Sequence, residues 1–508
     1  MEYGFGTDPA SGIPVVRGMP TQRSGLQLSA QTSGAVNAVL WKPANTSGLA
    51  YQLEKSSDFL NWTSVAAPVV SSQGNGGELL TWEAVDAGAS AGFVRIKITL
   101  DGSATSVGQP VGWSKVGFAV GTQSYGLCLL PDTLFVGTAK SVNGSTLLVQ
   151  DSEAGDLRAL FVPGRPVYLE FTQGLGEGQR IDVITAQCTA NTIALDLSSP
   201  YNTTASYPAS MTGARFVLRH HEVLGDVFPK ESFSGAPDEL NADAVVRYSG
   251  SVAATYWLLD TRAQPGGGLF QWTLSGDVTQ ADQAGLRLKP GEGVFVQRRS
   301  PPDLTMVDTG EIRPWKQRRT LQSGVHFVAG SYPVDQSPDS LGMTGARGFI
   351  STNSSSRSDR VQVWSGDAVP GGTSYVSYWY FAGSVNLPGP YWTRVGDASL
   401  GNVSGAALFP AGRGHFLQLI AGVDYLLPLP PGVGAFPAPG NSFMDSDDDG
   451  LSDLWEMQYF GNLGQSSGSA DADNDGITNA EEFLLGTNPA VVATVSTAPG
   501  LIVATPLE

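Results

Sequence analysis

The sequence is poor in several features that mark common classes of protein. It contains no apolar run of about 18 residues, so a membrane-spanning helix is not expected. No glycine-rich loop ends in lysine, which argues against a P-loop nucleotide site. Long stretches with helical periodicity are scarce, and only 15% of the residues are charged. We therefore expect a chain that is not built mainly from helices.

Cysteine is also scarce, since only Cys128 and Cys188 are present. The two residues either pair in an oxidising compartment or remain as buried thiols, and we expect buried thiols. The segment after Met1 is polar and rich in glycine, without the apolar stretch of a signal peptide. We therefore expect no signal peptide in this segment.

What the sequence has in abundance is glycine and proline. The 63 glycines and 32 prolines fall between short segments of alternating hydrophobicity, a pattern typical of β-strands joined by turns. At 508 residues the chain exceeds the size of one hydrophobic core. The sequence thus predicts an all-β fold with several β-sandwich or barrel domains in series.

Negative charge is concentrated near the end of the chain. Residues 443–489 hold eight Asp, three Glu and no Lys or Arg, which contributes −11 of the net charge of −18. The remainder of the chain is only mildly acidic. Binding to nucleic acid or to an anionic membrane is therefore not expected.

Two twelve-residue segments of this acidic region have the spacing of calcium loops. Each has aspartate at positions 1, 3 and 5, glycine at position 6, where the chain turns sharply around an ion, and glutamate at position 12. Position 7 supplies a backbone carbonyl and position 9 binds through water, so two Ca²⁺ ions are expected in a small C-terminal helix-loop arm. The predicted ligands are Asp445, Asp447, Asp449, Leu451, Asp453 and Glu456 in the first loop, and Asp471, Asp473, Asp475, Ile477, Asn479 and Glu482 in the second.

The apolar residue at position 7, rather than 8, departs from the intracellular EF-hand pattern. Residues 445–489 resemble instead the thrombospondin type 3-like repeats of secreted bacterial proteins. The resemblance implies a structural calcium site rather than a sensor, in a protein outside the cell or on its surface.

The beginning of the chain is similar to the end of this calcium arm. Residues 2–10 (Glu-Tyr-Gly-Phe-Gly-Thr-Asp-Pro-Ala) and 482–490 (Glu-Phe-Leu-Leu-Gly-Thr-Asn-Pro-Ala) share five of nine residues. Two explanations stay open. The chain is a piece of a longer tandem array, or it is a protomer that joins other copies of itself head to tail through strand addition.

An internal repeat organises the larger β-rich region. The first copy contains Asp243, Tyr256-Trp257 and Trp272, and ends in a Gly-x-Gly strand from Gly291. The second copy has the same order in Asp359, Tyr378-Trp379, Trp392 and a Gly-x-Gly strand from Gly412. Such a duplication indicates two pseudo-equivalent barrels or sandwich halves, in which we expect the Tyr-Trp strand to face the single Trp. This region resembles a paralogous family of exported β-rich proteins from Gram-negative environmental bacteria, without known activity.

Residues 51–62, with alternating residues and a terminal Trp62, resemble the fibronectin-III-like sandwiches of bacterial surface proteins. We expect Trp41, Trp62 and Trp82 to pack in its core rather than to bind carbohydrate. The predicted domains are 1–23 (the end of a calcium repeat and a linker), 24–112 (the sandwich), 113–310 and 311–432 (the first and second repeat copies), 433–490 (the calcium-binding arm) and 491–508 (a C-terminal strand).

Candidate catalytic groups are few. Gly464–Gly468 fits a nucleophile elbow but is followed by no histidine. His220-His221-Glu222 lacks the spacing of a zinc helix, and we expect a strand edge there. Asp243 and Asp359 are the acids repeated in both copies, and we expect them to cap backbone N–H groups rather than to serve as a glycosidase pair. A basic cluster between the copies is read as a solvated connector, or as a dock for the acidic arm of another copy; it comprises Arg298, Arg299, Arg313, Lys316, Arg318 and Arg319.

We therefore expect a non-enzymatic, calcium-stabilised structural protein on the surface of a Gram-negative bacterium or outside the cell. Its expected partners are other copies of itself or neighbouring modules of the same array or fibre. The alternative is an adhesin or glycan-binding module of a secreted bacterial protein, which uses exposed aromatic residues such as Trp272 and Trp392.

Overall fold

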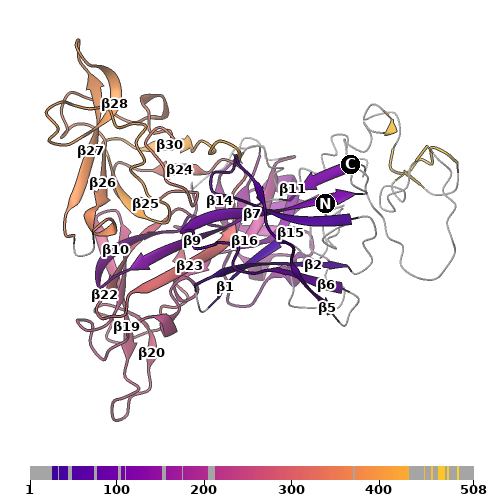
Figure 1. Ribbon diagram of the computed structural model, residues 1–508, viewed down its shortest axis with the longest axis horizontal. Coiled ribbons are helices and arrows are strands. Elements are labelled where there is room, and N and C mark those ends of the chain that lie inside the picture. Colours follow the sequence, from indigo (N-terminus) through magenta and orange to yellow (C-terminus); the bar gives the residue numbers. More distant parts are fainter. Residues whose placement is uncertain are drawn as a thin grey trace.

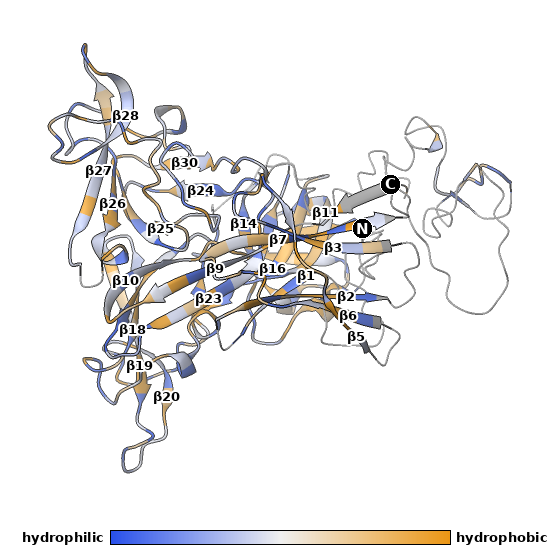
Figure 2. Ribbon diagram, in the orientation of Figure 1, coloured by the Kyte–Doolittle hydropathy of each residue, from blue (hydrophilic) through white to orange (hydrophobic). Residues whose placement is uncertain are grey.

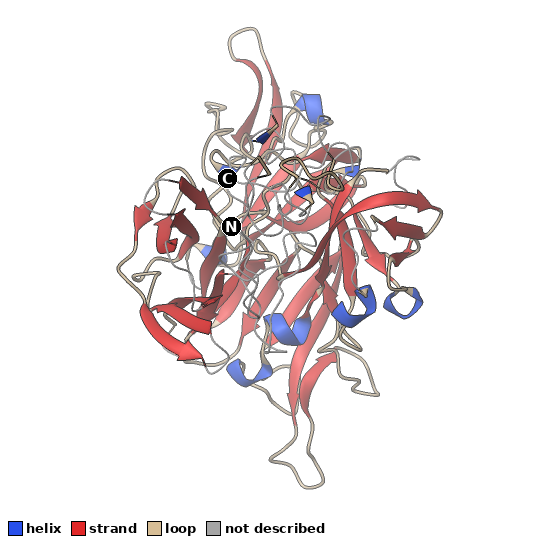
Figure 3. Cartoon of the chain, turned by 90° about the vertical axis from the view of Figure 1, so that its right-hand side faces the viewer, coloured by secondary structure: helices blue, strands red, loops and turns tan. Residues whose placement is uncertain are grey.

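The computed structural model describes residues 26–433 apart from nine short gaps, together with short stretches nearer the end of the chain. The gaps are 32–33, 44–48, 74–76, 101–103, 109, 151–155, 174–175, 204–211 and 370–371, and the later stretches are 451, 459–460, 467–474, 478–479 and 489–490. Strands account for nearly all of the regular structure (Figure 3), so the expected all-β fold is confirmed. The short helices are η1 (Leu157–Leu160), η3 (Thr185–Gln187), α2 (Leu224–Val227), η4 (Lys230–Ser232), η5 (Gly345–Arg347) and η6 (Ser365–Asp367).

The first unit is a sandwich of two antiparallel sheets. One sheet has the order β1 (Leu26–Ala30), β2 (Val36–Pro43), β6 (Gly77–Trp82), β5 (Val69–Gln73). The other has the order β23 (Leu304–Glu311), β9 (Val111–Phe118), β7 (Ala91–Leu100), β3 (Leu49–Ser56), β4 (Thr63–Ser64), with β8 (Ala104–Val107) also paired to β7. Alternating side chains from both sheets, such as Leu40 and Trp82 from one and Leu53 and Ile96 from the other, form the shared core.

Two strands of this sandwich cross predicted domain limits. Strand β9 continues through the expected boundary between residues 112 and 113, and β23 continues through the one between 310 and 311. The two strands pair with each other along their whole length, from Leu304 opposite Phe118 to Glu311 opposite Val111. The sandwich is therefore joined covalently and by hydrogen bonds to the region that follows it.

A closed six-stranded barrel forms the second unit. Its strands in order are β11 (Thr133–Asn143), β12 (Thr146–Val149), β15 (Thr192–Asp196), β14 (Arg180–Val183), β13 (Val167–Phe171) and β16 (Arg215–His220). Alternate residues point inward, and the interior is filled by rings and branched side chains, including Phe135, Phe171 and Phe216. Figure 2 shows this hydrophobic patterning on the central strands.

The two repeat copies form two five-stranded sheets with the same strand order. The first is β10 (Gly121–Gly126), β22 (Gly293–Arg298), β18 (Ala244–Ser249), β19 (Val252–Asp260), β20 (Phe270–Leu274). The second is β25 (Gly324–Ala329), β29 (Gly414–Leu419), β26 (Arg360–Trp364), β27 (Tyr375–Gly383), β28 (Pro388–Arg394). The hairpins that end in β20 and β28 project to opposite sides of the molecule (Figure 1).

Strands outside these sheets follow the same duplication. The pair β9–β23 flanks the first copy, and the pair β24 (Arg318–Leu321)–β30 (Val423–Leu426) flanks the second. The remaining pair, β17 (Glu222–Val223) with β21 (Arg287–Leu288), belongs to the first copy. Because the barrel strands all lie between β10 and β18, the barrel is an insertion in the first copy.

The register of the hairpins is also duplicated. Trp272 lies opposite Leu258 in the first copy, and Trp392 lies opposite Tyr380 in the second. The expectation that each Tyr-Trp strand faces the single tryptophan is therefore wrong for Trp257 and Trp379, which point to the other face of their sheets. The period of two along a strand puts one residue of each Tyr-Trp pair on the core face and the next on the opposite face.

The two sheets pack against each other through an aromatic cluster. Tyr248 and Phe295 come from the first copy, and Phe327, Trp364 and Phe416 come from the second. The rings of Phe327 and Phe295 are stacked with centroids 4.5 Å apart. A Cβ atom on Gly293 of the first copy would lie 3.1 Å from the Phe327 ring of the second, and one on Gly414 would lie 3.2 Å from the Cα atom of Gly293. The Gly-x-Gly signature of the repeat therefore reflects the close approach of the two copies.

Candidate functional site

Four of the twelve predicted calcium ligands belong to the described residues, namely Leu451, Asp471, Asp473 and Asn479. Leu451, at position 7 of the first loop, has a fully buried side chain. This is consistent with a role in which only its backbone carbonyl serves the ion. The other predicted ligands lie outside the described residues: Asp445, Asp447, Asp449, Asp453, Glu456, Asp475, Ile477 and Glu482.

The described part of the second loop is closed by Asn479, which is completely buried. Its side-chain nitrogen donates to the carbonyl of Ser467 at 3.0 Å, and its side-chain oxygen accepts from the N–H of Ala472 at 3.3 Å. The backbone N–H of Asn479 also donates to the carbonyl of Ala470 at 2.7 Å. Asn479 therefore fastens position 9 of the loop to the residues around position 1.

The donor set of this loop fits a hard cation. Asp471 and Asp473 are both partly buried on the same short segment, and one carboxylate oxygen of Asp473 is shielded from solvent. Between the third and fifth positions, Asn474 has a φ of 58°, a left-handed conformation that bends the chain tightly. Carboxylate oxygens on a tightly bent loop are the ligands that Ca²⁺ prefers. The residues present thus suit calcium, whereas the water-mediated role of Asn479 stays a prediction.

The repeated aspartates are buried caps for backbone N–H groups, as expected. Asp243 accepts from the backbone N–H groups of Ser234 and Arg299, both at 2.7 Å. Asp359 is equally inaccessible to solvent and also accepts two backbone N–H groups, at 2.8 and 2.7 Å. Burial raises the pKa of Asp359, although the two hydrogen bonds oppose this. The two carboxylates therefore serve the architecture of separate sheets.

Half of the basic cluster between the copies is buried rather than solvated: Arg298, Arg313 and Arg319 are at most 5% exposed, whereas Arg299 and Lys316 are exposed and Arg318 is partly exposed. Arg313 is 2% exposed and pairs with buried Glu170, which projects from the outer face of barrel strand β13. Arg298 pairs with Asp243, and buried Arg319 donates to the carbonyl of Ala329. The expectation of a solvated connector is therefore wrong for these three arginines, because a run of basic residues gives no sign of which ones the fold buries; docking of an acidic arm on the others stays a prediction.

The tryptophans proposed as glycan contacts are core residues. Trp272 and Trp392 are each 1% exposed, and their indole N–H groups donate to the carbonyls of Phe228 at 2.9 Å and Met343 at 2.8 Å. In the sandwich, Trp82 is buried as expected. The half-buried ring of Trp62 stacks under the guanidinium of Arg95, 4.1 Å from its centroid, while Trp41 is also half-buried.

His221 belongs to a buried polar network rather than to a metal site. Its Nε2 atom lies 2.7 Å from an oxygen of Asp182. Burial disfavours ionisation of Asp182, but His221, Ser199 and Arg287 together lower its pKa. Among the described residues no group of three or more His, Cys, Asp or Glu side chains is placed to hold a metal.

Cys128 and Cys188 are free buried thiols, as expected.

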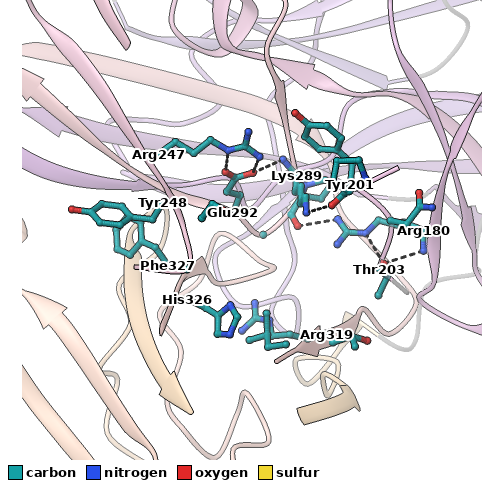
Figure 4. A pocket seen from close by; sticks show the side chains of 18 of the residues that line it. Arg180, Tyr201, Thr203, Arg247, Tyr248, Lys289, Glu292, Arg319, His326 and Phe327 are labelled. Atoms are coloured by element: carbon teal, nitrogen blue, oxygen red, sulfur yellow. Dashed lines mark hydrogen bonds and ion pairs between the residues drawn. The ribbon is translucent and has the colours of Figure 1, made fainter. Parts of the chain in front are cut away.

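Sequence reasoning missed a cleft of about 440 Å³ where the barrel meets the two copies. Figure 4 shows Arg180 and Tyr201 from the barrel, Arg247 and Lys289 from the first copy, and His326 from the second. No motif joins these residues, because they come from three separate parts of the chain. The only sign of the cleft in the sequence was that one turn differs in length between the two copies.

Most cations of the cleft are held by backbone oxygens. Arg180 donates to the carbonyl of Pro290 at 2.9 Å, and Lys289 donates to that of Pro200 at 2.6 Å. Arg247 forms an ion pair with Glu292. Burial lowers the pKa of Lys289, and the cations around it add to this effect while Glu292 opposes it. The cleft is therefore polar and positively charged.

Comparison with protein families finds the bacterial TSP3 repeat at residues 445–461 and 471–491. These repeats bind calcium in extracellular proteins, so the match supports a calcium-binding, extracellular structural role. No curated protein and no solved structure matches the chain. In the part of the chain that the structure describes, no helix is long and apolar enough to span a membrane.

Proposed function

We propose that this chain is a non-enzymatic extracellular structural protein in which a rigid β body carries a calcium-stiffened arm. The observation that carries the proposal is the pair of TSP3 stretches, each with aspartates and a terminal glutamate at calcium-loop spacing. The body supports it because its sandwich, its inserted barrel and its two repeat sheets are linked by shared strands and buried contacts.

Calcium supplies the positive charge that the arm lacks. Residues 443–489 carry −11 and no lysine or arginine, so neighbouring carboxylates repel one another in the metal-free arm. Two Ca²⁺ ions would offset four of these charges, and each would tie together the first and last residues of a twelve-residue loop. The described ligands Asp471 and Asp473 would hold the second ion, while Asn479 keeps their loop closed.

A calcium titration by calorimetry tests this part of the proposal. The chain is expected to bind two ions at up to millimolar concentration. Asp447→Asn and Asp473→Asn should each abolish or strongly weaken one site. Asp448→Asn is the matched control, because it removes one charge at position 4 of the first loop, which supplies no ligand. Absence of calcium uptake, or equal loss in the control, would refute the assignment.

Self-association through the arm is the second part of the proposal. The support is the similarity of residues 2–10 to residues 482–490, which is expected if successive modules repeat the same junction. Sedimentation velocity and electron microscopy with calcium and with chelator test it. We expect oligomers or fibres in calcium that dissociate or soften in chelator. Monodisperse monomers under both conditions would remove self-assembly without affecting the calcium sites.

A further inference from the structure

The cleft occupies a position that the second copy fills with its own chain. Two equivalent backbone hydrogen bonds relate the copies: Gly126 donates to Gly412, and Ala329 donates to Gly291, both at 2.9 Å. By the strand register, Ser124 opposite Phe295 corresponds to Phe327 opposite Phe416. The pseudo-symmetric arrangement therefore allows the two sides of the interface to be compared residue by residue.

On one side of the interface, a long turn of the second copy lies over Ser124. This turn, residues 365–374 between β26 and β27, includes η6 and carries Asp367. The carboxylate of Asp367 accepts from the N–H of Ser124 at 2.7 Å and from its hydroxyl at 2.6 Å, and lies 3.5 Å from Arg413. An anion of the chain itself thus occupies this position.

On the other side, the equivalent turn of the first copy is too short to cover its partner. Strands β18 and β19 are joined by only Gly250 and Ser251. The surface left uncovered includes Phe327, the counterpart of Ser124, and Glu292, the counterpart of Arg413, and it forms part of the cleft wall. The shorter turn therefore leaves a cleft open at the position where the other copy buries a carboxylate.

The walls of this cleft are suited to an anion. Arg180 and Lys289 line it and, within the described part of the chain, neither forms an ion pair with a carboxylate. Tyr201 has three cationic groups between 5.4 and 5.5 Å from its ring centroid, those of Arg247, Arg287 and Lys289. Positive charge in a partly enclosed, low-dielectric cleft attracts anions more strongly than the same charge on an open surface.

Part of the remaining wall carries aromatic rings and hydroxyl groups, which are the side-chain types that contact polyhydroxylated rings. Tyrosine rings come from Tyr201 and Tyr248, and hydroxyl groups come from Thr203, Ser249 and Thr320. A volume of about 440 Å³ lies within the usual range for a small-ligand site. We propose that the cleft binds the carboxylate-bearing ring of an acidic oligosaccharide, a uronate, with Arg180 and Lys289 facing the carboxylate.

Trigalacturonate and its fully methyl-esterified form are a matched pair of probes, because they share the same rings and differ in charge. Calorimetry on the full chain should detect trigalacturonate binding that weakens as salt increases. The ester should bind at least about tenfold more weakly. A capped Gly-Asp-Gly peptide tests whether any carboxylate on a peptide turn suffices, since Asp367 has that chemistry in the second copy.

A substitution at Gly250 tests the location without disturbing the core. A Cβ atom at Gly250 meets nothing within 4 Å, and the residue has a φ of 61°, which Asn and Asp tolerate. Gly250→Asp should weaken trigalacturonate binding by about tenfold by placing a negative charge at the cleft. Gly250→Asn has the same shape and should bind as the unmodified chain does.

The proposal is overturned if trigalacturonate fails to bind at millimolar concentration, if its ester binds equally well, or if the two Gly250 variants behave alike. Binding of the peptide alone would also overturn it, in favour of an acidic protein partner. None of these results depends on the calcium arm, because the cleft lies wholly within residues 180–327.

Discussion

Replacing the repeated buried aspartates one at a time should show how much stability each one contributes to its own sheet. Asp243 and Asp359 each accept two backbone N–H groups at corresponding positions of their sheets. Asp243 also receives the guanidinium of Arg298 at 2.5 Å, and Arg298 is itself 4% exposed. No such ion pair reaches Asp359 within the described residues. Asparagine at either position keeps the size and removes the charge.

The expected costs follow from the partners that each change leaves behind. Asp359→Asn retains one acceptor oxygen and turns an amide N–H toward the second backbone N–H. One buried donor is then unsatisfied, which costs about 1–3 kcal/mol. Because burial already raises the pKa of Asp359, loss of its charge is partly offset. Asp243→Asn also strands a buried guanidinium, so about 3–5 kcal/mol is expected.

Hydrogen exchange measured by mass spectrometry as a function of urea separates the two effects. Peptides from β18–β19 report on the first copy, and peptides from β26–β27 report on the second. Each variant should lower the opening free energy in its own sheet, and the loss should be larger for Asp243→Asn. Equal losses in both variants would show that Arg298 contributes nothing to the cap, and unchanged protection would refute the capping role itself.

Three further changes test other parts of the structure. Burial and the charge of Glu222 raise the pKa of Asp308 to about 7, so the folded state holds this proton more tightly than the unfolded chain does. The free energy of unfolding should therefore fall as the pH rises from 4 to 7, by up to about 1.4 kcal/mol per pH unit. Urea titrations should show that Asp308→Asn flattens this pH dependence. Trp272→Phe and Trp392→Phe should each cost about 1–3 kcal/mol, because each leaves a buried carbonyl without its indole donor; thermal unfolding that matches the parent chain would contradict this. Gly366→Ala should lower the thermal midpoint by loosening η6, since its Cβ would lie 2.7 Å from the carbonyl oxygen of Thr122; an unchanged midpoint would show that this contact is not tight.

The sequence predicted those parts of the fold in which local pattern and structure agree. Glycine-bounded alternating segments became strands, and the order of Asp, Tyr-Trp, Trp and Gly-x-Gly marked two sheets of identical strand order. The capping role of Asp243 and Asp359 was also readable, because a short acceptor before a strand satisfies free N–H groups. Calcium-loop spacing was specific enough to identify the TSP3 stretches, which the family comparison supports.

Long-range relations were not readable from the same patterns. The barrel is inserted between β10 and β18, and nothing in its sequence shows that it covers Arg313 through Glu170. Arg298 and Arg313, which look like parts of a surface cluster, are therefore buried ion-pair partners. The cleft is a similar case, since it depends on which residues from three units meet after the insertion has folded onto the duplicated sheets.

Because the body contains two copies of one unit, each copy can be compared with the other position by position to find where they differ in function. The positions that build each core and the interface between the sheets are retained, as in the tryptophan N–H bonds and the paired backbone bonds of Gly126 and Ala329. The copies differ where a turn of ten residues in one corresponds to a turn of two in the other. The longer turn delivers Asp367 to Ser124 and Arg413, whereas the shorter turn leaves Phe327 and Glu292 in the wall of an open cleft. The two copies therefore differ most at the place where Arg180 and Lys289 line the cleft, which is where the proposed uronate would bind.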